Sequence, residues 1–496
     1  MMDERTWLPG RMSKTANEAA ERTERTKGTL KKTSFPKYRA LGLVLTAAVC
    51  VVIIIVGMLS DRSSSCQIVD SEGNVLAAVS LESGIYEIDC EDADWAYADV
   101  AFHEAAELLS AQEQISEEAA QKRLVEKGAV IHTYLQEEMQ ESLAEAISQS
   151  WEAAAANSAG ALCNLDGELL ACYSHSSDPD GVNYVTWPTW AGSTMKPLAV
   201  YGPALEEDVI CWSTLEEDSP YSEIAGEDGT VSGWPSNTSD YTGSMITMAQ
   251  ALKESNNAVA VKTLSKFGLE NALEWLENRL GYTVDSERDI LASGGTDEIL
   301  DNLALGYLEA GVTVRQMLES YQVFAAGGVR RTLYAVDYIE AGKNIWQREA
   351  EEGIQIFSEE TAYILNRMLK GVVEEGGTGE AAMLDGVDLC GKTGTSSDYQ
   401  DNWFIGMTPQ YVCAIWYSCE NVELHTQNES VSICRQVMES LPDQEGLAFA
   451  CPEGVEKLSY CVKSGLLAGE YCEETADGYY KTGTFTEVCD CQPVSE

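Results

Sequence analysis

Three short polar motifs occur in a defined order along the 496-residue chain, and together they could carry out acyl transfer on a serine. Ser193-x-x-Lys196 comes first, Ser255-x-Asn257 follows, and Lys-Thr-Gly-Thr at 392–395 comes last. A serine hydroxyl is a weak nucleophile and needs a base within hydrogen-bond reach. A lysine amine can be that base when burial or a like charge lowers its pKa. Each motif alone is common, but their order and context constrain one another.

The first motif is expected at the start of a helix. Gly192 precedes Ser193, and Pro197 is best tolerated in a first helical turn. A spacing of three residues then places Lys196 on the same face as Ser193. Without that context the pattern means little, and its second copy at 34–37, Ser-Phe-Pro-Lys, is assigned no chemistry.

The second motif would complete a proton relay. The Ser255 hydroxyl could pass a proton between Lys196 and a leaving amine, and the Asn257 amide could hold the peptide groups of a substrate. Lys392 could be the like charge that lowers the pKa of Lys196. Taken alone, Ser255-Asn256-Asn257 would be a loop or a polar cluster at a helix end.

The third motif lies in residues 388–395, a predicted strand whose glycines allow another backbone to approach closely. A substrate peptide could pair with the edge of this strand. The backbone N–H groups of Ser193 and Thr395 would then form an oxyanion hole. The residues expected to hold a substrate carboxylate and backbone are Lys392, Thr393, Gly394 and Thr395. A second Lys-Thr-Gly-Thr at 481–484 lies in a Cys- and Tyr-rich tail and is assigned no chemistry.

Residues 41–60 are uncharged and predominantly apolar, which predicts a transmembrane helix. Residues 1–40 carry ten Lys and Arg against five Asp and Glu, so we expect a cytoplasmic N-terminus and an extracytoplasmic remainder. A cleaved signal peptide is the alternative, but the long basic region and the lack of an A-x-A site before Ser63 count against it. A buried core helix is a further alternative. Neither Cys50 nor Cys66 lies in a lipoprotein signal.

The net charge of −49 argues against binding to nucleic acid or anionic lipid, and solubility is its simplest explanation. The chain has 15 cysteines, for which disulfides are permitted outside the cell, although sequence does not give their pairing. Metal binding is the alternative, with Cys489-x-Cys491 as the closest pair. Only 4 histidines and no paired C-x-x-C sets argue against it, so we expect neither metal nor cofactor.

The chain after the membrane segment is predicted to form three parts. Residues 61–157 form a stalk or linker with a hairpin at 67–79, a helix at 97–126, a strand within 128–135 and a helix at 137–156. Residues 158–437 form a compact domain with one hairpin at Asp166-Gly167 and another across 402–417. The helical patterns between these hairpins predict one central antiparallel sheet flanked by helices, in an α/β (α+β) fold. Residues 438–496 form a Cys-rich extension.

Residues 158 to about 420 resemble the transpeptidase domain of penicillin-binding proteins, and more the bifunctional class than the monofunctional one. The resemblance implies a serine β-lactamase/transpeptidase-like fold. It extends to KGAVIHTYLQEEMQ, similar to a segment joining the two catalytic domains of bifunctional members, and to residues 459–489, similar to a tail in some Gram-positive members. The blocks that carry it are GSTMKPLAVYGPALE, MAQALKESNNAVAVK, GVTVRQMLESYQVFAAGG, SEETAYILNRMLKGVVEEGGTGEAAML and GKTGTSSDYQDNWFIGMTP.

The chain departs from the bifunctional pattern before the linker. Such members carry a glycosyltransferase domain there, with a Glu-Asp motif that continues through an aromatic residue to a histidine. Glu91-Asp92 and Trp95 match, but Ala98 stands where the histidine belongs. About 35 residues separate Asp92 from the linker strand, too few for such a domain. We therefore expect the chain to lack glycosyltransferase chemistry and to work beside a separate glycan polymerase.

The resemblance implies that Ser193 attacks the D-Ala-D-Ala end of a peptidoglycan stem peptide and that β-lactams acylate the same serine at the outer face of the bacterial membrane. Transfer to an amine would cross-link stems, and transfer to water would make a D,D-carboxypeptidase. A β-lactamase or β-lactam sensor is an alternative, although Glu274 and Asn278 have Glu277 where a Glu-x-x-Leu-Asn segment needs leucine. A noncatalytic scaffold in a wall-synthesis complex is another.

Overall fold

The computed structural model describes residues 65–151, 157–177, 181–225, 231–284, 303–396, 400–418 and 429–492. Ser64–Glu496 form one compact unit. The predicted membrane segment at 41–60 lies outside the described residues. Among the helices of the described ranges, none is both long and apolar enough to cross a bilayer.

The strands of the predicted linker belong to one six-stranded sheet. The predicted hairpin at 67–79 and the predicted strand within 128–135 are confirmed. Two further strands come from residues 336–347, inside the predicted transpeptidase region, and β12 pairs with β4. The linker sheet is therefore completed by a later part of the chain, and the domain limits at 157 and 437 stay predictions. In spatial order the strands are β13 (Asn344–Gln347), β12 (Val336–Ala341), β4 (Val130–Thr133), β1 (Cys66–Val69), β2 (Val75–Glu82) and β3 (Ile85–Cys90).

The predicted single helix at 97–126 is wrong, because the chain forms two helices, α2 (Trp95–Glu113) and α3 (Glu117–Lys127). Gln114 adopts a left-handed conformation with φ 54° and ends α2. Ser116 begins α3, because its side chain accepts the Ala119 N–H. The next predicted helix is observed as α4 (Glu137–Trp151).

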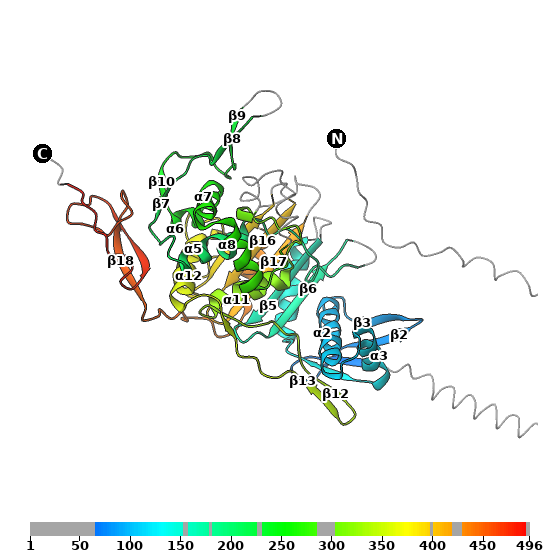
Figure 1. Cartoon of the computed structure of the whole chain (residues 1–496). Coiled ribbons are helices and arrows are strands. Elements are labelled where there is room, and N and C mark those ends of the chain that lie inside the picture. Colours follow the sequence, from blue (N-terminus) through cyan, green and yellow to red (C-terminus); the bar gives the residue numbers. More distant parts are fainter. Residues whose placement is uncertain are drawn as a thin grey trace, which may run out of the picture. The chain divides into compact units, whose positions relative to one another are not determined.

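A five-stranded antiparallel sheet forms the centre of the larger part, as predicted. Strands from the end of this region lie next to strands from its beginning (Figure 1). Side chains alternate between its two faces, with Trp403 and Ile405 in one core and Phe404 in the other. In order the strands are β15 (Cys390–Thr395), β16 (Asp401–Met407), β17 (Tyr411–Ser418), β5 (Asn157–Asn164) and β6 (Leu169–His175).

Helices cover both faces of this sheet. Helix α11 (Val314–Ala325) places Met317 and Tyr321 in the core that contains Trp403. Helices α4 and α13 (Glu429–Ser440) contribute to the core that contains Phe404. Strand β16 is buried along its whole length, as expected of a strand covered on two faces.

One buried carboxylate joins the two sheets. Glu104, on α2, is 3% exposed and lies 2.7 Å from Arg315 Nη2 on α11 and 3.0 Å from Arg348 Nη1. It also accepts the backbone N–H groups of Ala335 and Val336 at 3.0–3.1 Å, at the start of β12. Separating the two sheets would leave the buried Glu104 carboxylate without its partners, which costs free energy. The cluster therefore holds the linker sheet against the larger domain.

The remaining elements come from the chain between β6 and β15 or from the tail. They are α5 (Gly202–Glu206), α6 (Met248–Lys253), α7 (Asn257–Phe267), α8 (Leu269–Glu274), α12 (Glu359–Val373), the paired strands β7 (Leu215–Glu217) with β10 (Met245–Thr247), β8 (Ser222–Ala225) with β9 (Val231–Trp234), β11 (Val329–Arg330) with β14 (Ile354–Gln355), β18 (Val455–Cys461) with β19 (Thr475–Lys481), and the helical turns Gly192–Met195, Pro197–Tyr201, Trp275–Leu280 and Glu380–Ala382.

Candidate active site

The predicted nucleophile begins a helical segment, as its flanking residues indicate. Ser193 lies in a tight turn at Gly192–Met195, which continues through Pro197–Tyr201 into α5. Tyr321 on α11 donates its hydroxyl to the Thr194 carbonyl at 2.7 Å. The turn is thus anchored to a helix of the core, so the position of Ser193 does not depend on a surface loop.

The nucleophile turn lies directly against strand β15. A Cβ atom on Gly192, whose φ is 53°, would lie 2.6 Å from the Thr395 carbonyl oxygen. A Cβ on Gly394 would lie 2.7 Å from the Ala191 carbonyl oxygen. The close backbone approach predicted from the glycines is therefore confirmed, although the approaching backbone is the chain's own nucleophile turn.

Strand β15 is an edge strand, since in the described sheet it pairs with β16 alone. Thr393 and Thr395 are partly exposed, whereas Lys392 and Gly394 are buried. The strand thus offers an unpaired backbone edge beside Ser193, with hydroxyl groups at alternate positions.

Two buried lysine amines meet at Ser255. Lys196 Nζ lies 2.6 Å from the Ser255 carbonyl oxygen, 2.6 Å from Asn257 Oδ1 and 3.4 Å from Ser255 Oγ. Lys392 Nζ donates to Ser255 Oγ at 2.8 Å and to the Thr393 carbonyl at 2.9 Å. Both lysines are 0% exposed. The three predicted motifs therefore converge on one hydrogen-bonded cluster.

Burial shifts both amines toward the neutral form. It lowers the pKa of Lys196 well below its ordinary value, and the nearby Lys392 lowers that pKa further. Burial also lowers the pKa of Lys392 to about 7. A neutral Lys196 amine has two N–H donors, which suit the two oxygens at 2.6 Å, and one lone pair that can accept a proton.

Two details differ from the sequence expectation. The Ser193 hydroxyl makes no hydrogen bond to Lys196 or to any other described residue, so the nucleophile and the amine are near in sequence but not yet joined. The Asn257 amide is already engaged, because its oxygen accepts from Lys196 and its nitrogen donates to the Ser236 carbonyl at 2.7 Å. A substrate could form hydrogen bonds with the Asn257 amide only after the amide gives up one of these two partners.

Ser255 lies in a break between two helices, within residues 246–268, whose apolar periodicity is helical. Helix α6 ends at Lys253, Ser255 has a φ of 56°, and Asn256 begins α7 by accepting the Val259 N–H. A positive φ in a serine costs about 1 to 3 kcal/mol and persists only where its surroundings enforce it. Here the break directs both the Ser255 carbonyl and its hydroxyl toward Lys196.

Asp218 supports the second motif, and nothing in the sequence singled it out. It is 3% exposed, and it accepts hydrogen bonds from Asn256 and Asn237 at 2.8 Å and from the N–H of Thr242 at 2.8 Å. Asn237 in turn accepts the Asn257 N–H at 2.9 Å. Burial raises the pKa of Asp218, but these hydrogen bonds outweigh it and hold the pKa below its ordinary value.

Thr378 is a further residue that sequence reasoning did not place in the site. Its hydroxyl lies 2.7 Å from the Thr393 hydroxyl, next to the exposed edge of β15. It follows α12 in the block at 358–384 that carried the family resemblance, which was the available signal. The two hydroxyls form a polar pair beside the strand where a substrate carboxylate is expected.

Removing the Asp218 charge is expected to loosen the Ser255–Asn257 segment. Asp218→Asn should lower the free energy of unfolding by about 2 to 3 kcal/mol, because each hydrogen bond to an ionised group contributes roughly 1.5 to 3 kcal/mol. Since the folded-state pKa is depressed, the wild-type contribution is present above the ordinary pKa and is lost as the pH falls through the folded value. Chemical denaturation measures both effects. Exposed Asp240→Asn is the control, and equal losses in the two variants would contradict this role.

The comparisons with known proteins agree with this architecture. Residues 158–439, more than half of the chain, match the penicillin binding protein transpeptidase domain. Penicillin-binding protein 1A of Clostridium botulinum (strain Langeland / NCTC 10281 / Type F) is 34% identical over 236 residues, which are 47% of this chain and 27% of that protein. Penicillin-binding protein 1F of Bacillus subtilis (strain 168) is 29% identical over 427 residues, covering 82% of this chain and 54% of that protein. The chain thus spans about half, or less, of the length of these relatives.

Solved structures share the fold. The D,D-transpeptidase domain of a peptidoglycan glycosyltransferase from Eggerthella lenta has a TM-score of 0.56 at 22% identity, and the match covers 76% of this chain and 98% of that one. The PonA1 protein from Mycobacterium tuberculosis in complex with penicillin V has a TM-score of 0.58 at 18% identity, covering 73% of this chain and 96% of that one. By its fold and by the match over residues 158–439, the chain belongs to the penicillin-binding protein transpeptidase domain family.

Proposed function

We propose that the chain is a membrane-anchored peptidoglycan D,D-transpeptidase that works through an acyl-enzyme on Ser193. The observation that carries this proposal is the pair of buried lysines that meet at Ser255 beside the nucleophile turn. A buried amine with a lowered pKa can accept a proton at neutral pH, which is what a serine nucleophile requires.

Acylation begins when the Ser193 oxygen attacks the carbonyl carbon between the last two D-alanines of a stem peptide. The new C–O bond forms while the hydroxyl proton moves to the neutral Lys196 amine. This step needs the Lys196 amine to turn toward Ser193, which substrate binding would favour by displacing the Asn257 amide from it. The same displacement would free Asn257 to hold the substrate's peptide group.

The negative charge on the former carbonyl oxygen would be held by the backbone N–H groups of Ser193 and Thr395. Collapse of this intermediate breaks the C–N bond, and the Lys196 proton passes through the Ser255 hydroxyl to the departing D-alanine amine. Protonated Lys392, with the hydroxyls of Thr393 and Thr395, would hold the terminal carboxylate of the substrate. The unpaired edge of β15 supports pairing with the substrate backbone.

The acyl group then passes to an amine of a neighbouring stem, which forms a new amide and frees Ser193. Transfer to water instead would make the enzyme a D,D-carboxypeptidase. Residues 41–60 would anchor the chain in the bacterial membrane with the active site outside. Incubation with a stem pentapeptide and an amine acceptor distinguishes the two outcomes, because only transpeptidation yields a cross-linked product.

Fluorescent penicillin should label the full-length protein covalently, and Ser193→Ala should abolish the label, because the β-lactam carbonyl is expected to acylate this serine. A label that persists for hours favours a transpeptidase, whereas rapid loss would indicate a β-lactamase. Ser239→Ala, at an exposed serine, is the control, and it should label like the wild-type protein. Absence of label on folded wild-type protein would contradict the proposal and would favour a noncatalytic scaffold.

Acylation of the protein by penicillin should become slower as the pH rises through about 7, where Lys392 loses its proton. Its pKa is depressed by burial, so the cation that would bind the penicillin carboxylate is present below this pH and absent above it. The second-order rate constant of acylation should fall about tenfold or more, because this is the effect of losing a hydrogen bond between charged groups.

Lys392→Gln should be slow at every pH and lack this alkaline limb. Lys481→Gln, at the second Lys-Thr-Gly-Thr, should keep the limb, because its ammonium contacts the carbonyls of Leu205 and Glu206 instead. Persistence of the limb in Lys392→Gln would refute the assignment.

We also infer that a separate glycan polymerase supplies the strands that this enzyme cross-links, because the expected glycosyltransferase motif is incomplete at Ala98. Co-purification from membranes with a polymerase tests this inference. Glycan polymerisation by the purified chain alone would overturn it.

A further inference from the structure

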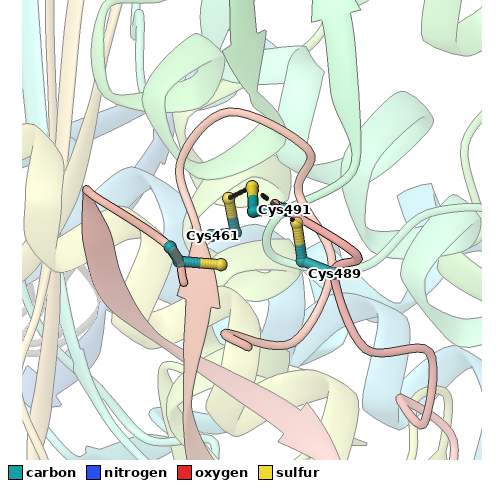
Figure 2. Close-up of side chains that lie close together, drawn as sticks. Cys461, Cys489 and Cys491 are labelled. Carbon is teal, nitrogen blue, oxygen red and sulfur yellow. Dashed lines mark hydrogen bonds between the residues drawn. The ribbon is translucent and has the colours of Figure 1, made fainter. Parts of the chain in front are cut away.

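Four cysteines of the C-terminal tail gather at one point. Cys461 ends β18, Cys472 lies between β18 and β19, and Cys489 and Cys491 follow β19. Their sulfur atoms all lie within 4.8 Å of one another. Figure 2 shows Cys461, at the end of β18, beside Cys489 and Cys491 of the final segment of the tail. Cys461 is 1% exposed and Cys489 is 8% exposed, whereas Cys472 and Cys491 are partly exposed, so the cluster is half shielded from solvent.

The spacing of the sulfur atoms suits a tetrahedral metal ion. Zinc binds thiolate at about 2.3 Å, so the sulfur atoms of a tetrahedral site lie about 3.8 Å apart. The Sγ atoms of Cys461 and Cys491 are 3.9 Å apart, and those of Cys489 and Cys491 are 3.2 Å apart. Cys491 is close to two other sulfurs at once, whereas a disulfide would bring it together with only one of them.

The backbone around the cluster is arranged as a metal site requires. The Gly469 N–H donates to Cys472 Sγ at 3.2 Å, a contact that would stabilise a thiolate ligand. The turn after Cys461 is closed by the Gly465 N–H on the Cys461 carbonyl at 2.8 Å, with Gly465 at φ 72°. The Cys489 N–H donates to the Leu467 carbonyl at 2.8 Å and brings the final segment to this turn.

We propose that Cys461, Cys472, Cys489 and Cys491 bind one structural Zn²⁺ ion. Four soft sulfur ligands that leave no open position favour a closed structural site over a catalytic one. This assignment revises the expectation of no metal. That expectation relied on the lack of paired C-x-x-C sets, but the β18–β19 hairpin brings ligands distant in sequence to one point.

The proposed site would hold the tail against the transpeptidase domain. Ser213 donates its hydroxyl to the Gly465 carbonyl at 2.6 Å, in the turn that follows Cys461. The rings of Trp212 and Tyr479 lie 5.5 Å apart in an edge-on contact. The carbonyl of Thr214, which follows Ser213 in the chain, accepts the Met248 N–H at the start of α6. Helix α6 leads to Ser255. The ion would therefore stabilise a surface that supports the second catalytic motif from behind.

The test uses full-length protein purified without added reductant, chelator or metal. Elemental analysis should find one zinc ion per chain. After replacement of the metal by Co²⁺, the protein should show the visible absorption bands of a tetrahedral ion and thiolate-to-cobalt charge transfer. Cys489→Ser should lose most of the bound zinc, whereas Cys451→Ser, at an exposed tail cysteine outside the cluster, should keep it.

Cys472→His and Cys472→Ser form a second pair, because imidazole can replace a thiolate on zinc and a hydroxyl does not. The histidine variant should retain zinc and the serine variant should lose it, while circular dichroism and thermal unfolding report whether each variant has folded. Two disulfides among these cysteines in a non-reducing peptide map would overturn the proposal. So would a zinc-free wild-type protein, or equal zinc in Cys489→Ser and Cys451→Ser. These results are independent of the proposed acyl transfer, because they measure metal content.

Discussion

The burial of two lysine amines around one serine hydroxyl is the constraint on which the rest of the site depends. An ammonium ion removed from water costs several kcal/mol unless it is paired, and the described residues around Lys196 and Lys392 supply hydrogen-bond acceptors but no carboxylate. The site therefore relieves the cost by lowering the affinity of the amines for protons. The consequence is that burial favours the neutral, proton-accepting form of the Lys196 amine more than it would for an exposed lysine.

This constraint explains features that would otherwise be unfavourable. The left-handed Ser255 interrupts a helix, yet the interruption directs its carbonyl and hydroxyl toward Lys196. Asp218 is a buried charge, yet it organises the two asparagines that border Asn257. Gly192 and Gly394 leave no room for a side chain, because β15 must approach the nucleophile turn to bring Lys392 to the same hydroxyl.

Sequence patterns predicted the parts of the fold that depend on local chemistry. The Asp166-Gly167 turn and the apolar runs that flank residues 408–410 identified hairpins of the central sheet, and the order of the motifs identified which residues would meet. Other features depend on distant contacts. The break after Gln114, the left-handed Ser255 and the pairing of β12 with β4 are determined by packing partners far away in the chain. The cysteine cluster was obscured for the same reason, since its four members meet only after β18 and β19 pair.

The most direct test of the account is mass spectrometry of the full-length protein during turnover of a stem pentapeptide ending in D-Ala-D-Ala. The account predicts an ester-linked adduct, equal to the stem peptide minus its last D-alanine, on the peptide that contains Ser193. Omission of an amine acceptor should increase this adduct. Release of D-alanine without an adduct on Ser193, or with the adduct on another residue, would contradict it.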